Sequence, residues 1–243
     1  MGDISRKEDD MERPFAGGIV SIRNHPGPSP DGPGTPTTVQ VRFLGFHCIE
    51  ESNEWSASDE PYFLISVVST HRSVTKKFGP FENVDAGENH PMVAGVAAFE
   101  DDVIPPVILG VIANEHDEGT PEEAAEKARE VARALMEKME EAAASFGAAT
   151  AGSHVIPEWL RDIWIGWIPE GAAAVLGLGD DHVGSNGRIL FDYDPQLKQW
   201  KTPPSIGTFE DNPYNVKLKV GVNPEEGKYE LYFDVKVQNA GHV

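Results

Sequence analysis

PVILGVIANEHDEG, residues 106–119, is the stretch of this sequence that decides the fold. Its first part, Val107–Ala113, is a continuous apolar run with the length of one buried β-strand. The run ends abruptly in acidic residues, so an apolar strand leads directly into an acidic loop. The same succession recurs elsewhere. The acids that follow apolar runs are Glu115, Asp117 and Glu118 after residues 107–113, Glu50, Glu51 and Glu54 after residues 39–49, and Asp180 and Asp181 after residues 171–178.

Strands that meet at one end of a β-sandwich would bring these acidic loops together. Carboxylates that are gathered without matching bases repel one another unless a cation lies among them. Oxygen ligands of this kind suit hard cations. The pattern therefore predicts an acidic, mainly β domain with a calcium or magnesium site.

The composition is that of a globular protein with an acidic balance. Hydrophobic residues make up 40% and aromatic residues 9% of the 243 residues, which suits a chain with a real core rather than a disordered one. The formal net charge of −20 repels phosphate backbones, so we expect no nucleic-acid partner. The alternative is that the charge serves solubility alone. The single cysteine, Cys48, excludes an internal disulfide and a multi-cysteine zinc site.

The first residues carry no recognisable secretory signal, because Met1–Phe15 contains no apolar core segment. No apolar run reaches the roughly 18 residues needed to span a bilayer. We therefore expect synthesis in the cytoplasm and no transmembrane segment, with export by a signal-less route left open. Residues 1–37 are expected to form a flexible leader rich in proline and glycine, and residues 38–243 the folded domain.

Alternation of apolar and polar residues predicts the strands of this domain. Thr38–Ile49 keeps one phase as far as Phe43 and then changes phase, with Leu44, Phe46 and Cys48 apolar, which predicts a bulge near Gly45. Further strands are expected at Phe15–Ile22, Pro61–Val68 and Arg188–Asp192, and a hairpin is expected to pair Asn215–Val222 with residues 229–237 across a turn at Asn223–Gly227.

Four short motifs, in the same order along the chain, resemble the strand ends and calcium loops of C2 domains. They are Asp59-Glu60-Pro61-Tyr62 before a β run, Thr75–Pro91 with its Glu88-Asn89-His90-Pro91, Glu115-His116-Asp117 after the apolar strand, and Asp180-Asp181-His182-Val183-Gly184. The resemblance covers roughly residues 38–193 and implies an antiparallel β-sandwich that holds Ca²⁺ in acidic loops. The metal ligands that it implies are Asp59, Glu60, Glu115, Asp117, Asp180 and Asp181.

The third and fourth motifs are separated by a long stretch where C2 domains have a brief loop. Thr120, Pro121 and Glu123 match a capping box with proline at the first helical position. Apolar residues then recur at helical spacing, which predicts an amphipathic helix over Pro121–Phe146. We expect an α-helical insertion at about 120–167 that packs on the sandwich. The alternative is an arm that contacts a membrane or a partner through Trp159, Trp164 and Trp167.

Other site chemistries fit the sequence less well. Zn²⁺ is the alternative metal, because His116 and His182 lie beside the acids. A helix–loop–helix calcium site does not fit, since its last ligand position would be Ala125. Neither a Gly-x-Ser-x-Gly motif nor a Walker loop is present, and no residue is assigned a catalytic role.

The sequence thus predicts a mainly β protein, an antiparallel, C2-like β-sandwich with an α-helical insertion. We expect its acidic loops to hold Ca²⁺ and to shape a surface for a protein, a glycan or a membrane surface. A non-enzymatic toxin-like or interaction protein that acts through its helical insertion is the second interpretation. A metal-dependent hydrolase is the third.

Overall fold

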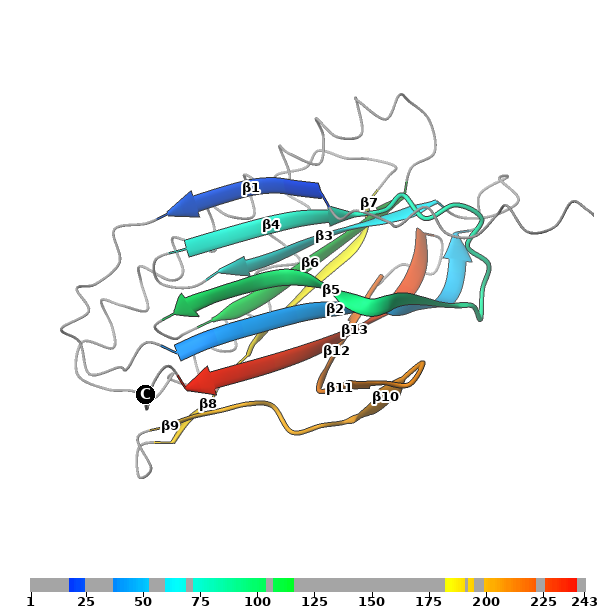
Figure 1. Cartoon of the computed structure of the whole chain (residues 1–243). Coiled ribbons are helices and arrows are strands. Elements are labelled where there is room, and N and C mark those ends of the chain that lie inside the picture. The colour runs from blue at the N-terminus through cyan, green and yellow to red at the C-terminus, as the bar shows by residue number, and fades with distance from the viewer. Residues whose placement is uncertain are drawn as a thin grey trace, which may run out of the picture.

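The computed structural model of the protein describes a set of strands and their connections (Figure 1). The described residues are 18–24, 37–52, 60–68, 72–103, 107–115, 182–190, 192–194, 199–221 and 226–239. The strands are β1 (Gly18–Asn24), β2 (Thr37–Ser52), β3 (Pro61–Val68), β4 (Arg72–Phe78), β5 (Asn89–Val103), β6 (Ile108–Glu115), β7 (His182–Ile189), β8 (Asp192–Asp194), β9 (Gln199–Lys201), β10 (Gly207–Phe209), β11 (Asn212–Tyr214), β12 (Val216–Val220) and β13 (Glu226–Asn239).

Most strands belong to two antiparallel sheets, which we call sheet A and sheet B. Sheet A has the strand order β1-β4-β3-β6-β7, and sheet B has the order β12-β13-β2-β5. Apolar side chains from both sheets meet in one shared core, so the arrangement is sandwich-like. Strands β8 and β9 form a separate two-stranded ribbon, and β10 and β11 form another.

The expected fold class, a mainly β sandwich with an α-helical insertion, needs correction. The described residues are all-β and contain strands and connections but no helix. The expected insertion at 120–167, including the predicted helix over Pro121–Phe146, lies outside the described residues. That helix rested on capping residues and apolar spacing alone, and local propensity of this kind is a weak guide without tertiary contacts.

Strand β2 lies between β13 and β5 in sheet B and contains the predicted bulge. In its pairing with β13, Phe43 lies opposite Phe233 and Gly45 opposite Tyr232, so Leu44 has no cross-strand partner. A Cβ atom on Gly45 would lie 2.2 Å from the His90 carbonyl oxygen, and the φ angle of +131° also favours glycine. The bulge near Gly45 is therefore confirmed.

The bulge changes which face of sheet B the following residues occupy. Phe43 and Phe46 both belong to the core between the sheets, although they are three residues apart. Leu44 belongs instead to a small outer cluster with Phe209 and Tyr232. The sequence pattern placed Leu44 in one phase with Phe46, and that assignment was wrong because Leu44 is the extra residue of the bulge and packs on the outer face.

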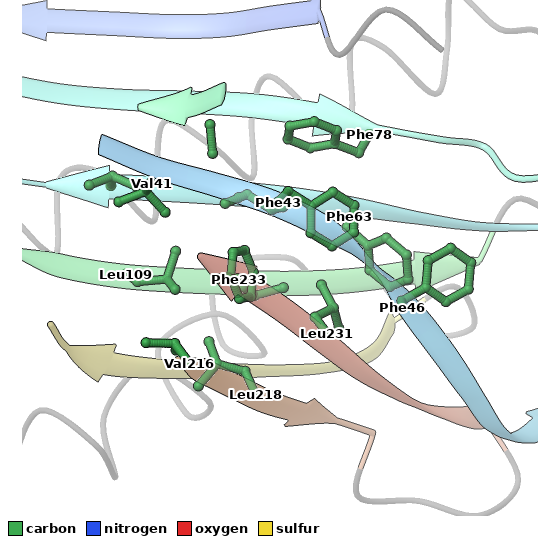
Figure 2. Packing of buried hydrophobic residues seen from close by; sticks show 14 of the residues in the cluster. Val41, Phe43, Phe46, Phe63, Phe78, Leu109, Val216, Leu218, Leu231 and Phe233 are labelled. Atoms are coloured by element: carbon green, nitrogen blue, oxygen red, sulfur yellow. The ribbon is translucent and has the colours of Figure 1, made fainter. Parts of the chain in front are cut away.

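The core between the sheets is rich in phenylalanine (Figure 2). Phe43 of β2 makes an edge-to-face contact with Phe78 of β4, with 5.0 Å between the ring centroids, and a tilted contact with Phe233 of β13 at 5.5 Å. Such ring pairs contribute about 0.5–1.5 kcal/mol each beyond the area that they bury. One connected set of aromatic contacts therefore joins β2 and β13 of sheet B to β4 of sheet A.

Several other predicted elements are confirmed. Strand β1 pairs with β4 at one edge of sheet A, close to the edge strand expected at Phe15–Ile22. Strand β3 has the predicted bounds, Pro61–Val68. Strands β12 and β13 pair as the predicted hairpin, with Leu218 opposite Leu231. Residues 222–225 of the expected turn lie outside the described residues.

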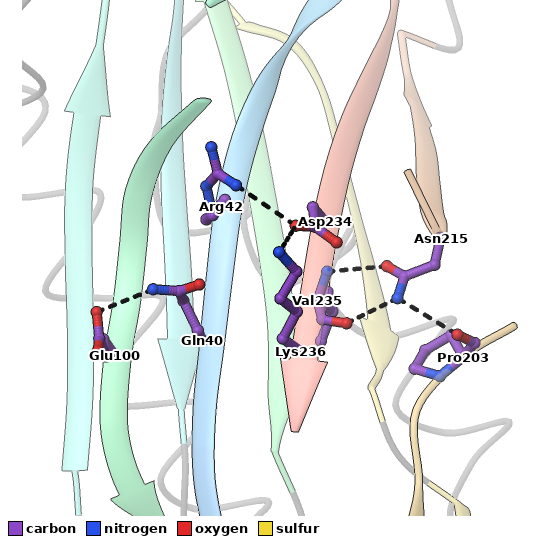
Figure 3. Close-up of polar contacts among 8 residues, drawn as sticks. All are labelled: Gln40, Arg42, Glu100, Pro203, Asn215, Asp234, Val235 and Lys236. Carbon is purple, nitrogen blue, oxygen red and sulfur yellow. Dashed lines mark hydrogen bonds and ion pairs between the residues drawn. The ribbon is translucent and has the colours of Figure 1, made fainter. Parts of the chain in front are cut away.

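The outer face of sheet B is polar, and its charges are paired (Figure 3). Asp234 lies 3.6 Å from Arg42 and 3.1 Å from Lys236. Glu230 lies 3.2 Å from both Lys217 and Lys219. The lysine side chains reach solvent, with Lys219 59% and Lys236 50% exposed. The lysine ends on this face therefore reach solvent, whereas the carboxylates with which they pair are mostly buried.

The β10–β11 hairpin packs on part of that outer face. The Phe209 ring stacks on the Tyr232 ring at 4.0 Å, next to Leu44. The turn between β10 and β11 has two central residues, and both have positive φ, +47° at Glu210 and +68° at Asp211. Hairpin turns of this kind favour Asn-Gly, so Glu-Asp here carries backbone strain.

We expect the double change Glu210→Asn and Asp211→Gly to stabilise the protein by about 1 kcal/mol, because it removes the strain of the turn. The midpoint of urea unfolding measures this. The control is Thr208→Gly in strand β10, where glycine should destabilise by about 0.5–1 kcal/mol. A double variant that is no more stable than wild type would contradict the strain.

Candidate functional site

One end of the sandwich brings together strand ends that carry acidic residues. In sheet A, Pro61 at the start of β3 lies opposite Glu115 at the end of β6, and Asn114 of β6 lies opposite His182 at the start of β7. The loop 79–88 is at the same end, because the Phe81 amide donates to the Pro61 carbonyl at 2.9 Å. We call this region the acidic end, and its described residues are 47–52, 60–62, 79–90, 114–115, 182–183 and 226–228.

Acids far outnumber bases at the acidic end. Lys228 is the one lysine or arginine among its described residues. Like charges at 4 Å repel by about 1 kcal/mol in water and by more where the dielectric constant is lower. A bound cation would reduce this repulsion. The acidic residues are Glu50, Glu51, Glu60, Glu82, Asp85, Glu88, Glu115 and Glu226.

Two of the six predicted metal ligands are described, and the structure brings them to neighbouring strand ends. Glu60 immediately precedes Pro61, which is the cross-strand partner of Glu115. The other four predicted ligands each lie within two residues, along the chain, of Glu60, Glu115 or His182. These four lie outside the described residues: Asp59, Asp117, Asp180 and Asp181.

Glu115 is the buried acid of this region. It is 5% exposed, and its carboxylate accepts a hydrogen bond from the Ser52 hydroxyl at 3.1 Å. Ser52 ends β2 in sheet B, whereas Glu115 ends β6 in sheet A. This hydrogen bond therefore links the two sheets at the acidic end and orients one carboxylate there.

The loop 79–88 is held against β2 by hydrogen bonds. The Cys48 amide donates to the Glu88 carbonyl at 3.0 Å, and the Gly87 amide donates to the Cys48 carbonyl at 2.8 Å. The Ala86 amide donates to the Glu51 carboxylate at 2.7 Å. The result is a second oriented carboxylate, on β2, beside an acidic loop.

Glu51 and Glu88 were not among the predicted ligands, although both are part of the acidic end. Glu51 was recognised as an acid after an apolar strand, and Glu88 as part of a C2-like motif. Their proximity depends on the pairing of β2 with β5, in which His47 lies opposite Asn89. No local pattern reveals that pairing, since alternation identifies a strand but not its neighbour.

His90 is the second residue of β5, which directly follows the loop 79–88. Its ring stacks on Phe46 with 4.7 Å between centroids and an angle of 7°, and its Nε2 is 3.2 Å from a Glu88 carboxylate oxygen. Burial lowers the pKa of His90, and the nearby Glu88 and Asp85 only partly oppose this effect. Proton uptake by His90 in the folded protein is therefore disfavoured.

The described residues alone do not complete a metal site. Among them, no group of three or more His, Cys, Asp or Glu side chains is arranged to hold a metal ion. Ca²⁺ takes 6–8 oxygen ligands. Glu60 and Glu115 could supply carboxylate oxygens, and the rest would come from residues that the structure does not describe. For Zn²⁺, His182 begins β7, whereas His116 lies outside the described residues.

The comparisons with known proteins give no family. The sequence matches no protein-family model, and no curated protein matches it significantly. Within the described stretches, no helix has the length and apolar character needed to cross a membrane. The chemistry of the acidic end therefore carries the functional argument.

The lowered pKa of His90 predicts how the stability of the fold depends on pH. Because the pKa of His90 is lower in the folded than in the unfolded protein, stability should fall as pH decreases through the unfolded value of about 6.5. His90→Phe keeps the ring stack and removes the proton site, so its melting temperature should fall less than that of wild type between pH 7.5 and 5.5. His47→Gln is the control for loss of a histidine. Equal pH dependence in wild type and His90→Phe would contradict this role.

Proposed function

We propose that the acidic end binds a divalent cation, preferably Ca²⁺, and that the loaded end is the surface through which the protein contacts a partner. One observation carries the proposal: the start of β3, the end of β6 and the start of β7 are neighbours in sheet A. All six predicted ligands lie at these three strand ends or within two residues of them along the chain.

The chemistry of the proposed ligands favours Ca²⁺. All of them are carboxylates, and Ca²⁺ accepts mono- or bidentate carboxylates, carbonyls and water in a flexible shell. Mg²⁺ demands a tighter octahedral geometry and keeps its water molecules, while Zn²⁺ prefers nitrogen and sulfur ligands. Cation binding also offsets the mutual repulsion of the acids at this end. Lys228 is the one lysine or arginine among the described residues there.

The proposal extends from the cation to a binding surface. A cation that is held by loop carboxylates can keep coordination positions that are filled by water. An oxygen-rich group of a partner, such as a carboxylate, a hydroxyl or a phosphate, can replace that water. The partner is therefore a protein, a glycan or a membrane surface that supplies such a group. The charge of −20 disfavours an anionic partner unless the cation is bound.

Calcium should stabilise the fold. At a free concentration about a hundred times the dissociation constant, a ligand that binds only the folded state adds about 2.7 kcal/mol to the free energy of unfolding. Calorimetric titration of EDTA-treated protein gives the dissociation constant, and thermal unfolding gives the stabilisation. Mg²⁺ and Zn²⁺ serve as comparison ions. An unchanged melting temperature in millimolar Ca²⁺, with no heat of binding, would reject the proposal.

Substitutions that remove one charge can distinguish the acids that bind the cation from acids that only add to the net charge. Asp117→Asn, Asp181→Asn and Glu115→Gln should each weaken calcium binding at least about tenfold, or 1.4 kcal/mol. For Asp117→Asn and Asp181→Asn, the metal-free melting temperature should stay equal or rise, since each change removes a repelling charge. In the Glu115→Gln variant, the amide oxygen of the new side chain can still accept the hydrogen bond from Ser52.

Glu100→Gln is the matched control for these variants. Glu100 pairs with Gln40 in the first half of β2, far along the strand from Ser52, and its side chain is exposed. The control removes one charge at a distance from the acidic end and should leave the affinity unchanged. If all four variants bind calcium with the same affinity, the acids act through the net charge of the protein rather than through a specific site.

A further inference from the structure

One corner of the sandwich is closed by contacts between the edge strands of the two sheets. Strand β7 is an edge of sheet A, β12 is an edge of sheet B, and the two strands contact each other. A Cβ atom on Gly184 of β7 would lie 2.5 Å from the amide nitrogen of Gly221, which directly follows β12. The Asn186 side-chain amide donates to the Lys219 carbonyl at 2.6 Å. This hydrogen bond therefore links the two sheets at the corner.

The residue that makes this link precedes a glycine. Asn186-Gly187 is the one Asn-Gly pair in the sequence, and glycine has no side chain to hinder an approach to its backbone nitrogen. The Gly187 amide donates to Oδ1 of Asn186 at 2.7 Å. Because Cγ is bonded to Oδ1 at about 1.2 Å, the Gly187 nitrogen lies within about 4 Å of Cγ. These are the two atoms that join when an asparagine cyclises to a succinimide.

The strand pairing leaves the Gly187 amide out of the ladder between β6 and β7. The Leu190 amide donates to the Val107 carbonyl at 2.9 Å, and the register from there to Gly187 opposite Gly110 has no bulge. Hydrogen-bonded and non-hydrogen-bonded pairs alternate along an antiparallel ladder, so Gly187 directs its amide away from β6. Loss of that proton breaks no ladder hydrogen bond. Asn186 is also partly exposed, so hydroxide and water can reach it.

We propose that Asn186 is a site of spontaneous deamidation in the folded protein, and that the modification weakens the corner between β7 and β12. The Gly187 nitrogen gives its proton to hydroxide and attacks Cγ of Asn186. The N–Cγ bond forms, the Cγ–Nδ2 bond breaks, and Nδ2 takes a proton from water and leaves as ammonia. Water then opens the succinimide at either carbonyl, which leaves an aspartate or an isoaspartate at position 186.

Either product removes the hydrogen bond between the sheets. The new carboxylate has no N–H, so an oxygen would face the Lys219 carbonyl where Nδ2 now donates. Isoaspartate also adds one carbon to the backbone, which disturbs the pairing of the residues that follow, such as Arg188 opposite Leu109. Each product adds one negative charge to an acidic chain. The modified corner is therefore expected to be less stable.

The site is tested on the full chain by following every asparagine with peptide mass spectrometry during incubation. We expect Asn186 to deamidate first, and faster at mildly alkaline than at mildly acidic pH, because the attacking nitrogen must lose its proton. Gly187→Ala should slow the reaction at least about tenfold, or 1.4 kcal/mol in the activation free energy, because its methyl group hinders the attack. If this variant fails to fold, the wild-type comparison among asparagines decides alone.

Two results would overturn the site. One is an Asn186 that stays intact while another asparagine of the same sample has deamidated. The other is a reaction that proceeds only in protein kept above its urea unfolding midpoint, since the folded contact would then play no part.

The structural effect of the modification is measured by urea unfolding. Asn186→Asp, and deamidated wild type separated by anion exchange, should both unfold at lower urea concentration than unmodified wild type. Gln238→Glu makes the same change from amide to acid at an exposed residue of β13 and should cause a smaller loss. An unchanged midpoint for Asn186→Asp would overturn the role of this hydrogen bond at the corner. All measurements are made in EDTA, so failure of the cation proposal would not affect them.

Discussion

The pairing of β2 on both sides is the constraint on which the described structure depends. Thr37–Ser52 pairs with β13 along one edge and with β5 along the other, so it forms the centre of sheet B. Its bulge at Leu44 and Gly45 lets one strand place Phe43 and Phe46 in the core and Leu44 under the β10–β11 hairpin. At its end, Ser52 reaches across to Glu115 in sheet A. Core packing and the acidic end are thus connected through one strand.

The charged side chains of the described residues are unevenly arranged. On the outer face of sheet B, Glu230 and Asp234 each form ion pairs with two lysine or arginine side chains, so their negative charges are already compensated. At the acidic end, Lys228 is the one lysine or arginine among the described residues. The first arrangement stabilises the fold without any ligand, whereas the second concentrates negative charge at one end of the sandwich.

Sheet A is buried on both of its faces. One face packs against sheet B, and the other is as deeply buried in Leu64 and Ile112 as the core itself. A sheet that is buried on both faces needs continuous apolar strands rather than alternating ones, and β6, Ile108–Glu115, is buried at every residue. The acidic end and this second buried face share β3 and β6.

The sequence by itself determined part of the strand pattern, although it did not predict β5 or the β10–β11 hairpin. Alternation and apolar runs predicted β2, β3, β6 and the β12–β13 hairpin, because the two-residue period of a strand is a local property. It also predicted the bulge, since an extra residue in one strand changes the phase of the alternation, as it does beside Gly45. Tertiary structure alone decided which strands are neighbours, and therefore that Glu51, Glu88 and Glu115 share one end with Glu60. It also decided that both faces of sheet A are buried. Such contacts join residues far apart in the chain, and no local period encodes the partner of a strand or the far side of a sheet.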